Sequence, residues 1–166
     1  ASSKLNVDFT KFTPNAYAET FGTIYIGGKL TSINDKAFFG KTNLRSIIIP
    51  DGTKTIGYNA FSGCTSLTAV SIPNSVTSIN SSAFSKCSGL TSVNIPDSVT
   101  NIGNGVFYEC SGLKSIDVSE NNQYYCSLNG VLFDKAFKVL IQYPDGKENS
   151  EYIIPDGITE IGIRAF

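Results

Sequence analysis

Apolar and polar positions recur with a fixed period of 23 residues along most of the chain. The dipeptide Ile-Pro stands at Ile49-Pro50, Ile72-Pro73 and Ile95-Pro96, and the apolar positions around it keep the same spacing. Such regular self-similarity is typical of coils that stack into a solenoid. The main columns of equivalent residues are Leu44, Leu67, Leu90 and Leu113; Ile47, Val70, Val93 and Ile116; Ile49, Ile72, Ile95 and Val118; Leu30, Thr53, Val76 and Val99; Ile33, Ile56, Ile79 and Ile102; and Phe38, Phe61, Phe84 and Phe107.

A single coil has too little apolar surface to fold alone. About eight apolar side chains per coil contribute on the order of 10–20 kcal/mol when buried, whereas ordering the backbone costs roughly 1–2 kcal/mol per residue. Neighbouring coils must therefore cover both flat sides of each coil.

Within a coil, the alternating Val-x-Ile segment predicts a short β-strand that the following proline ends. The Ala-Phe segment, residues 82–86 in the middle copy, predicts one 3₁₀ or α-helical turn on the opposite side. Only Gly or Asn follows the second isoleucine column, which predicts a positive φ there. These positions are Asn34, Gly57, Asn80, Gly103 and Gly162.

The whole pattern, Leu-x-x-Ile/Val-x-Ile-Pro-x-x-Val-x-x-Ile-x-x-x-Ala-Phe-x-x-Cys, resembles the BspA-like subgroup of leucine-rich repeats and covers nearly all of residues 21–166. The resemblance implies a solenoid with a parallel sheet on one face and short helical turns opposite. It also implies a secreted or cell-surface protein, located outside the cell, that serves in adhesion and protein binding.

We expect one domain with four parts: an N-terminal cap and divergent first coil (1–29), regular coils (30–118), a coil with an insertion (119–153) and an incomplete last coil (154–166). A helix is expected over 15–21, after Thr13-Pro14. In the insertion, Asn129-Gly130 between two apolar runs predicts a β-hairpin, and residues 139–143 add a third strand to form a β-meander. The last coil stops before its Cys and Leu columns, which favours a fragment or a partner that covers it.

Composition argues against several classes of function. The net charge of −1 provides no basic surface for nucleic acid, and no apolar run is long enough to span a membrane. The chain has no histidine, the usual general base near neutral pH. The acids Glu109, Asp117, Glu120 and Asp134 show no spacing that places two carboxylates across a cleft. We therefore expect no enzyme activity, no cofactor and no metal.

Three of the four cysteines, Cys64, Cys87 and Cys110, share one column. Parallel Cβ directions disfavour a disulfide between them, and a column does not converge on a metal. We interpret them as buried thiols that pack as small apolar groups, although their redox state stays open. Cys126 has no partner in the column pattern.

Residues between the inward strand positions are expected to project outward from the concave face of the sheet. Their identity varies from coil to coil, so they are the candidate ligand-binding residues: Tyr25, Ile48, Ser71, Asn94, Asp117 and Ile153. The ligand would be a protein or a glycan, with the surface of a host or neighbouring cell as one source. Two alternatives remain: these side chains are only solvated surface, or the chain is a passive spacer that presents other domains.

The aromatic residues of the insertion are a second candidate surface. They are Tyr124, Tyr125, Phe133, Phe137, Tyr143 and Tyr152. Exposed aromatic side chains can stack on sugars or anchor protein partners. The alternative is that they form the core of the meander itself.

Overall fold

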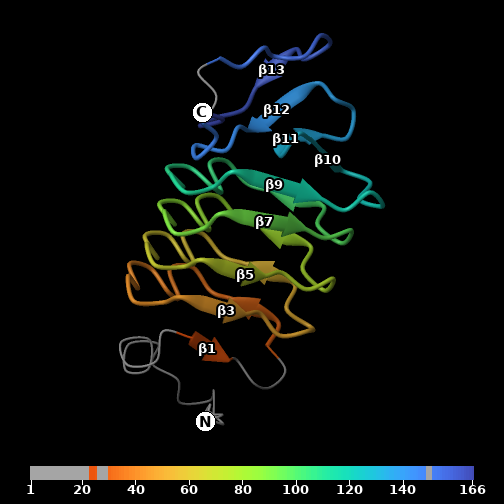
Figure 1. Cartoon of the computed structure of the whole chain (residues 1–166). Coiled ribbons are helices and arrows are strands. Elements are labelled where there is room, and N and C mark those ends of the chain that lie inside the picture. The colour runs from red at the N-terminus through yellow and green to blue at the C-terminus, as the bar shows by residue number, and fades with distance from the viewer. Residues whose placement is uncertain (1–22, 26–29, 149–150) are drawn as a thin grey trace.

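The computed structural model describes residues 23–25, 30–148 and 151–166, with side chains from residue 30 onward. The expected helix over 15–21 and most of the expected cap (1–29) lie outside these residues. The described chain is a stack of coils in which each turn of backbone lies directly on the previous one (Figure 1).

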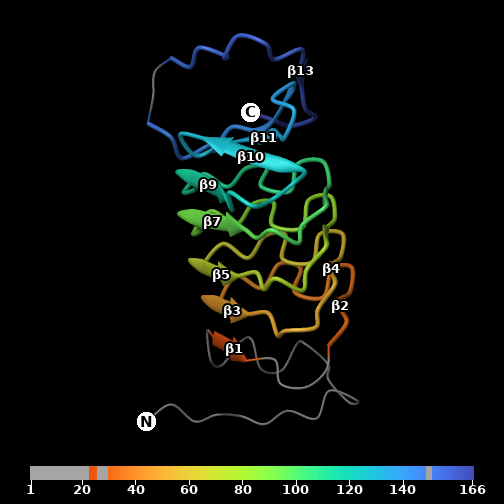
Figure 2. The same cartoon turned by 90° about the vertical axis from the view of Figure 1, so that its right-hand side faces the viewer.

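Each regular coil contributes two short strands on opposite sides of the stack (Figure 2). The front strands are β1 (Thr23–Tyr25), β3 (Ser46–Ile48), β5 (Ala69–Ser71), β7 (Ser92–Ile95) and β9 (Ser115–Val118). The back strands are β2 (Ser32–Ile33), β4 (Thr55–Ile56), β6 (Ser78–Ile79) and β8 (Asn101–Ile102). The back strands form a second parallel sheet, in the order β2-β4-β6-β8, which the sequence pattern did not predict.

The strand register confirms the 23-residue stacking. In the front strands, Ile24 pairs with Ile47 and Ile47 with Val70, while β7 pairs with β9 through Val93 and Ile116. In the back strands, Ile33, Ile56, Ile79 and Ile102 are successive partners. All of these pairs are parallel, so residues of one column lie above one another.

The segment that was expected to form a helical turn consists of consecutive hydrogen-bonded turns. Within residues 30–148 and 151–166 no helix is present, so the helical part of the prediction is not confirmed. The turns are held by bonds within a coil, such as Ala60 N–H to Gly57 O at 3.2 Å, and also by bonds between coils: Phe38 N–H donates to Ala60 O at 2.7 Å, and Phe61 N–H donates to Ala83 O at 2.7 Å. A ladder of bonds between coils therefore accompanies the turns within each coil.

The prediction of a positive φ at the Gly/Asn column was wrong. Positive φ angles occur two residues later, at Lys36 (56°), Asn59 (53°) and Ser82 (58°). The glycines of the column are needed for space instead: a Cβ on Gly57 would lie 2.6 Å from both the backbone N and the Oδ1 of Asp35. Close approach of the neighbouring coil therefore explains glycine at this position.

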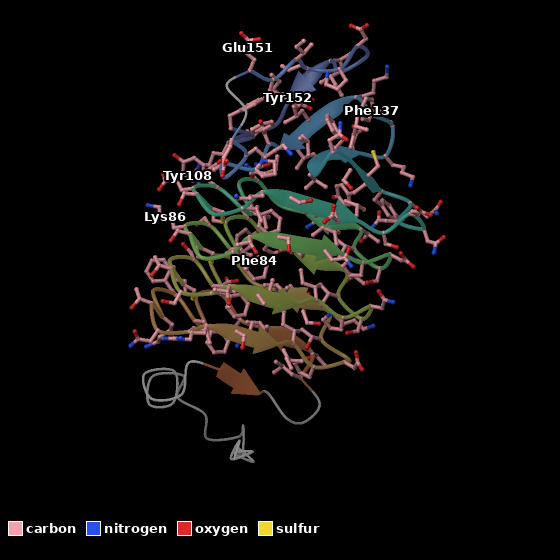
Figure 3. All side chains as sticks on the ribbon, viewed as in Figure 1. Phe84, Lys86, Tyr108, Phe137, Glu151 and Tyr152 are labelled. Carbon is pink, nitrogen blue, oxygen red and sulfur yellow. The ribbon has the colours of Figure 1, made fainter. Side chains whose placement is uncertain are left out.

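The core is a continuous column of side chains along the axis of the stack. Phe61, Phe84 and Leu67 are completely buried. The rings of Phe38, Phe61 and Phe84 stack with centroid distances of 5.0 and 5.1 Å and interplanar angles of 3°. Figure 3 shows Phe84 inside the stack and Lys86 and Tyr108 at the edge formed by the turns.

The insertion forms the expected meander. Strands β10 (Tyr125–Leu128), β11 (Val131–Asp134) and β12 (Val139–Gln142) pair in antiparallel order, and β12 then pairs in parallel with β13 (Glu160–Ile161) of the last coil. The hairpin lies against β9, where Ile116 N–H donates to Gly130 O at 2.9 Å. A second, smaller core of Val131, Phe133, Leu140 and Ala165 joins the meander to the last coil.

Candidate functional site

The outward face of the front strands, here called the front face, contains four described candidate residues. Ile48 is 50% exposed, and Ser71, Asn94 and Asp117 are also exposed. Register pairs Ile48 with Ser71 and Asn94 with Asp117. The alternation of the strands thus brings these side chains to one surface while their neighbours enter the core.

The two remaining candidates differ from these four. Tyr25 pairs in register with Ile48, and its side chain is outside the described residues. Ile153 is 86% exposed, but it lies in a segment without strand structure. Gly130 of the hairpin takes the position next to β9, so Ile153 does not continue the row directly beyond Asp117.

The front face is polar with few charges. Next to the candidates lie Ser46, Ala69, Ser92 and Ser115, which share a second outward column. Ser115 Oγ donates to Asp117 Oδ1 at 2.9 Å, which orients that carboxylate. Short side chains on a regular backbone give a surface that can offer hydroxyl and amide groups to a ligand.

The cysteine column has a role that the sequence analysis missed. All four cysteines are free thiols. Cys64 Sγ donates to Phe38 O at 3.1 Å, Cys87 Sγ to Phe61 O at 3.1 Å, and Cys110 Sγ to Phe84 O at 3.0 Å. Burial raises the pKa of Cys64 to about 11 and of Cys110 to about 12, so these thiols are protonated near neutral pH. They pack in the core and also link successive coils.

The insertion aromatics are mostly core residues, as the alternative interpretation predicted. Phe133 is completely buried and lies 4.5 Å from Phe137 between ring centroids. The ring centroids of Tyr143 and Tyr152 lie 4.6 Å apart. Tyr125 is half-buried, and its hydroxyl oxygen accepts from Ile102 N–H at 2.8 Å. Only Tyr124 of this group, 52% exposed, presents a large side chain to solvent.

A cluster of charges on the turn edge was not foreseen. Lys86 Nζ lies 3.6 Å from Glu109 Oε2. The guanidinium carbon of Arg164, in the last coil, lies 4.9 Å from the centroid of the Tyr108 ring. Burial and the Glu109 carboxylate raise the pKa of Asp145, while the Glu109 backbone N–H opposes the shift. No repeat column predicts that Asp145 and Arg164 lie near Glu109 and Tyr108, because the insertion separates them along the chain. The Arg164 contact holds the last coil against an earlier turn, and the Lys86–Glu109 pair joins two regular coils.

The other acids named from the sequence are apart from this cluster. Asp134 Oδ1 accepts from the backbone N–H groups of Lys138 and Val139 at 2.7 and 2.6 Å, so it closes the reversal between β11 and β12. Among the described residues, no group of three or more His, Cys, Asp or Glu side chains could hold a metal ion. No helix in the described part of the chain is long and apolar enough to cross a membrane.

Solved structures include several similar chains. The pneumococcal vaccine antigen PcpA is 28% identical over 85% of this chain and 41% of that chain, with a TM-score of 0.76. A leucine-rich cell surface protein from Faecalibacterium prausnitzii is 35% identical over 77% of this chain and 34% of that chain, with a TM-score of 0.71. A leucine-rich repeat protein from Eubacterium ventriosum shares the fold, with a TM-score of 0.72. It is 24% identical over 88% of this chain and 45% of that chain. The chain thus spans less than half the length of each.

The same repeat is recognised at the level of sequence. The profile of the BspA-type leucine-rich repeat region matches residues 10–139 in six copies. None of the curated proteins matches the chain. Because the matched region covers most of the sequence and its coils stack in the expected register, the chain belongs to the BspA-type leucine-rich repeat family.

Proposed function

We propose that this chain is a binding module of a secreted or surface-attached protein, and that it recognises a protein or glycan ligand through the front face. The family and the similarity to a cell surface protein support this location. The observation that carries the proposal is the contrast between the two sides of the front strands. Inward positions repeat the same apolar residues, whereas outward positions change from Ile48 to Ser71, Asn94 and Asp117.

This contrast has a physical basis. The inward side chains must fill a fixed space between coils, so packing determines their identity. The outward side chains contact solvent and contribute little to stability, so they are free to be selected for a ligand. A rigid scaffold that positions variable polar side chains is a common arrangement for recognition.

A screen with the intact chain tests the proposal. The 166-residue protein is applied to arrays of glycans and of extracellular proteins, and the thermally unfolded chain serves as the control. The proposal predicts saturable capture of the folded chain by at least one ligand and no capture of the unfolded chain. A passive spacer would bind no array member specifically.

A further inference from the structure

The front strands do not form one continuous sheet. They divide into β1-β3-β5 and β7-β9, while the back strands remain a single four-stranded sheet. The division falls between two copies of the regular repeat, here called coil 2 (residues 67–89, containing β5) and coil 3 (residues 90–112, containing β7). No change in repeat length accompanies it, since both coils have 23 residues.

Backbone hydrogen bonds show the division directly. Thr68 N–H donates to Arg45 O at 2.9 Å, and Lys114 N–H donates to Thr91 O at 2.9 Å. Thr91 occupies the equivalent position between them, and no bond from its N–H to Thr68 O is present. Across the described residues of β5 and β7 no ladder bond is formed, in contrast to the registered pairs on either side.

Side-chain burial changes at the same place. Val70 and Ile72 of coil 2 are half-buried. Their equivalents in the adjacent coils are buried, with Ile47 1% exposed and Val93 3% exposed. The loss of burial is therefore local to the front of coil 2 and is not a property of the column.

The phenylalanine column gives an independent measure. The Phe84–Phe107 centroid distance, which joins coils 2 and 3, is 5.8 Å with an interplanar angle of 10°. The two earlier steps of the column are 5.0 and 5.1 Å with angles of 3°. Coils 2 and 3 thus lie farther apart and are tilted relative to each other at this column.

The other sides of the same two coils remain joined. Ser78 pairs with Asn101 and Ile79 with Ile102 in the back sheet. On the turn side, Phe84 N–H donates to Val106 O at 3.0 Å and Lys86 N–H donates to Tyr108 O at 2.8 Å. One side of the stack therefore lacks backbone bonds where the two other sides keep them.

We propose that the contact between β5 and β7 is a seam at which the front face opens and closes, with the back sheet and the turns acting as the hinge. Opening the seam breaks no backbone ladder, and Val70 and Ile72 on its β5 side are already half-buried, so it costs less than separating any other pair of regular coils. Ile48 and Ser71 lie on one side of the seam, and Asn94 and Asp117 lie on the other. The seam thus gives the front face an adjustable spacing, and its existence does not depend on the proposed ligand binding.

Amide hydrogen exchange followed by NMR on the intact chain tests the seam, because the repeat provides matched amides. The amide of Thr91 is compared with those of Thr68 and Lys114, after correction for intrinsic exchange rates. In a parallel ladder the N–H and C=O groups of one residue point to the same neighbouring strand. The Ile116 N–H points to the next coil, because it donates to Gly130 O. The equivalent N–H groups of Val70 and Val93 therefore also point to the next coil, which is β7 for Val70 and β9 for Val93. The amides of Val70 and Val93 thus form a second matched comparison across and beyond the seam.

We expect Thr91 and Val70 to exchange at least about tenfold faster than their matched amides, as loss of one protecting backbone bond implies. Phe84 and Lys86 should remain as protected as Phe61 and Gly63, because the hinge side stays closed. Equal protection of Thr91, Thr68 and Lys114 would overturn the seam. Fast exchange of Phe84 and Lys86 would overturn the hinge, because the two coils would then separate entirely.

Discussion

At the scale of single residues, a side chain of the repeat fills the core, bonds to the coil below or faces solvent, and some side chains do two of these. Phe84 fills the core, since it is completely buried and stacks on a phenylalanine ring above and below. Cys87 fills the core and also donates to the coil below. Ser71, one residue from the inward Val70, faces solvent.

Phe84→Ala and Ser71→Ala should differ sharply in their effect on the free energy of unfolding. Phe84→Ala removes a ring that is packed on both faces and should cost about 3–5 kcal/mol. Ser71→Ala should change stability by less than about 0.5 kcal/mol, because its hydroxyl is exposed. Urea unfolding of both variants measures the difference. Similar costs for both would mean that the ring is not a core residue.

The cysteine column predicts a loss of stability in alkali. The pKa of Cys87 is raised from its ordinary value of 9.0, first by burial and then by the neighbouring Cys110 and Cys64. Below pH 9 the thiol is protonated in both the folded and the unfolded chain and has no effect. Above pH 9 only the unfolded chain loses the proton, so stability falls by up to about 1.4 kcal/mol per pH unit for each such thiol.

Cys87→Ser isolates this effect, because a serine hydroxyl donates a hydrogen bond but does not titrate in this range. Urea unfolding at pH 8 and pH 10.5 should show a smaller loss of stability for the variant than for the unchanged protein. Tyrosine and lysine titration affects both proteins equally and cancels in the comparison. Parallel losses in the two proteins would show that the thiol does not remain protonated when folded.

At the scale of elements, the insertion begins where a polar residue replaces a core valine. Asn122 occupies the column of Val76 and Val99 and is completely buried. Its Nδ2 donates to Pro96 O at 2.8 Å and to Val99 O at 3.0 Å. Its Oδ1 accepts from the N–H groups of Tyr124 and Tyr125 at 2.8 and 2.9 Å. The side chain thus joins the last regular coil to the start of β10.

Asn122→Val should destabilise the protein even though valine is the normal residue of the column. The substitution removes the side-chain partner of the Val99 carbonyl and of the Tyr124 and Tyr125 amides, which should cost on the order of 3 kcal/mol. Thermal unfolding followed by circular dichroism provides the measurement. Asn121→Val, at an exposed neighbouring position, is the control and should have little effect. Equal melting temperatures for the two variants would contradict the role of Asn122.

Residue pattern alone predicted the elements that depend on local chemistry. The Val-x-Ile alternation located the front strands, and Asn129-Gly130 located the hairpin turn. The back strands escaped prediction because each has only two residues, so no alternation is visible. The helical turns were not confirmed, and part of the hydrogen bonding of these segments joins residues of different coils, which no local pattern reveals. The role of Asn122 was not predicted, since its partners come from two segments, residues 96–99 and 124–125.

The candidate site was predicted to the extent that strand alternation determines it. Period two places Ile48, Ser71, Asn94 and Asp117 outward once the strands are known. Strand alternation could not predict where Ile153 lies, because the hairpin, and not the last coil, pairs next to β9. Sequence also gave no indication of the break between β5 and β7, since both strands carry the regular pattern.

At the scale of the whole molecule, the solenoid is a row of nearly equivalent units whose stability comes from contacts between neighbours. This arrangement assigns folding and recognition to different residues. The interior columns specify the stack, and the front face remains available for recognition. The insertion adds a second small core, and Arg164 connects the last coil to Tyr108 and to Ser82, whose Oγ lies 3.4 Å from Nη1.

The most direct test of the account compares two matched double variants in binding to a ligand captured in the array screen. One variant carries Ile48→Lys and Asn94→Lys on the front face. The other carries Tyr58→Lys and Asn104→Lys, which are exposed positions on the turn side. Both add two positive charges, and titration calorimetry gives the Kd of each. We expect a Kd at least roughly tenfold weaker for the front-face variant and an unchanged Kd for the turn variant. Equal affinities for the two variants, or a loss confined to the turn variant, would contradict it.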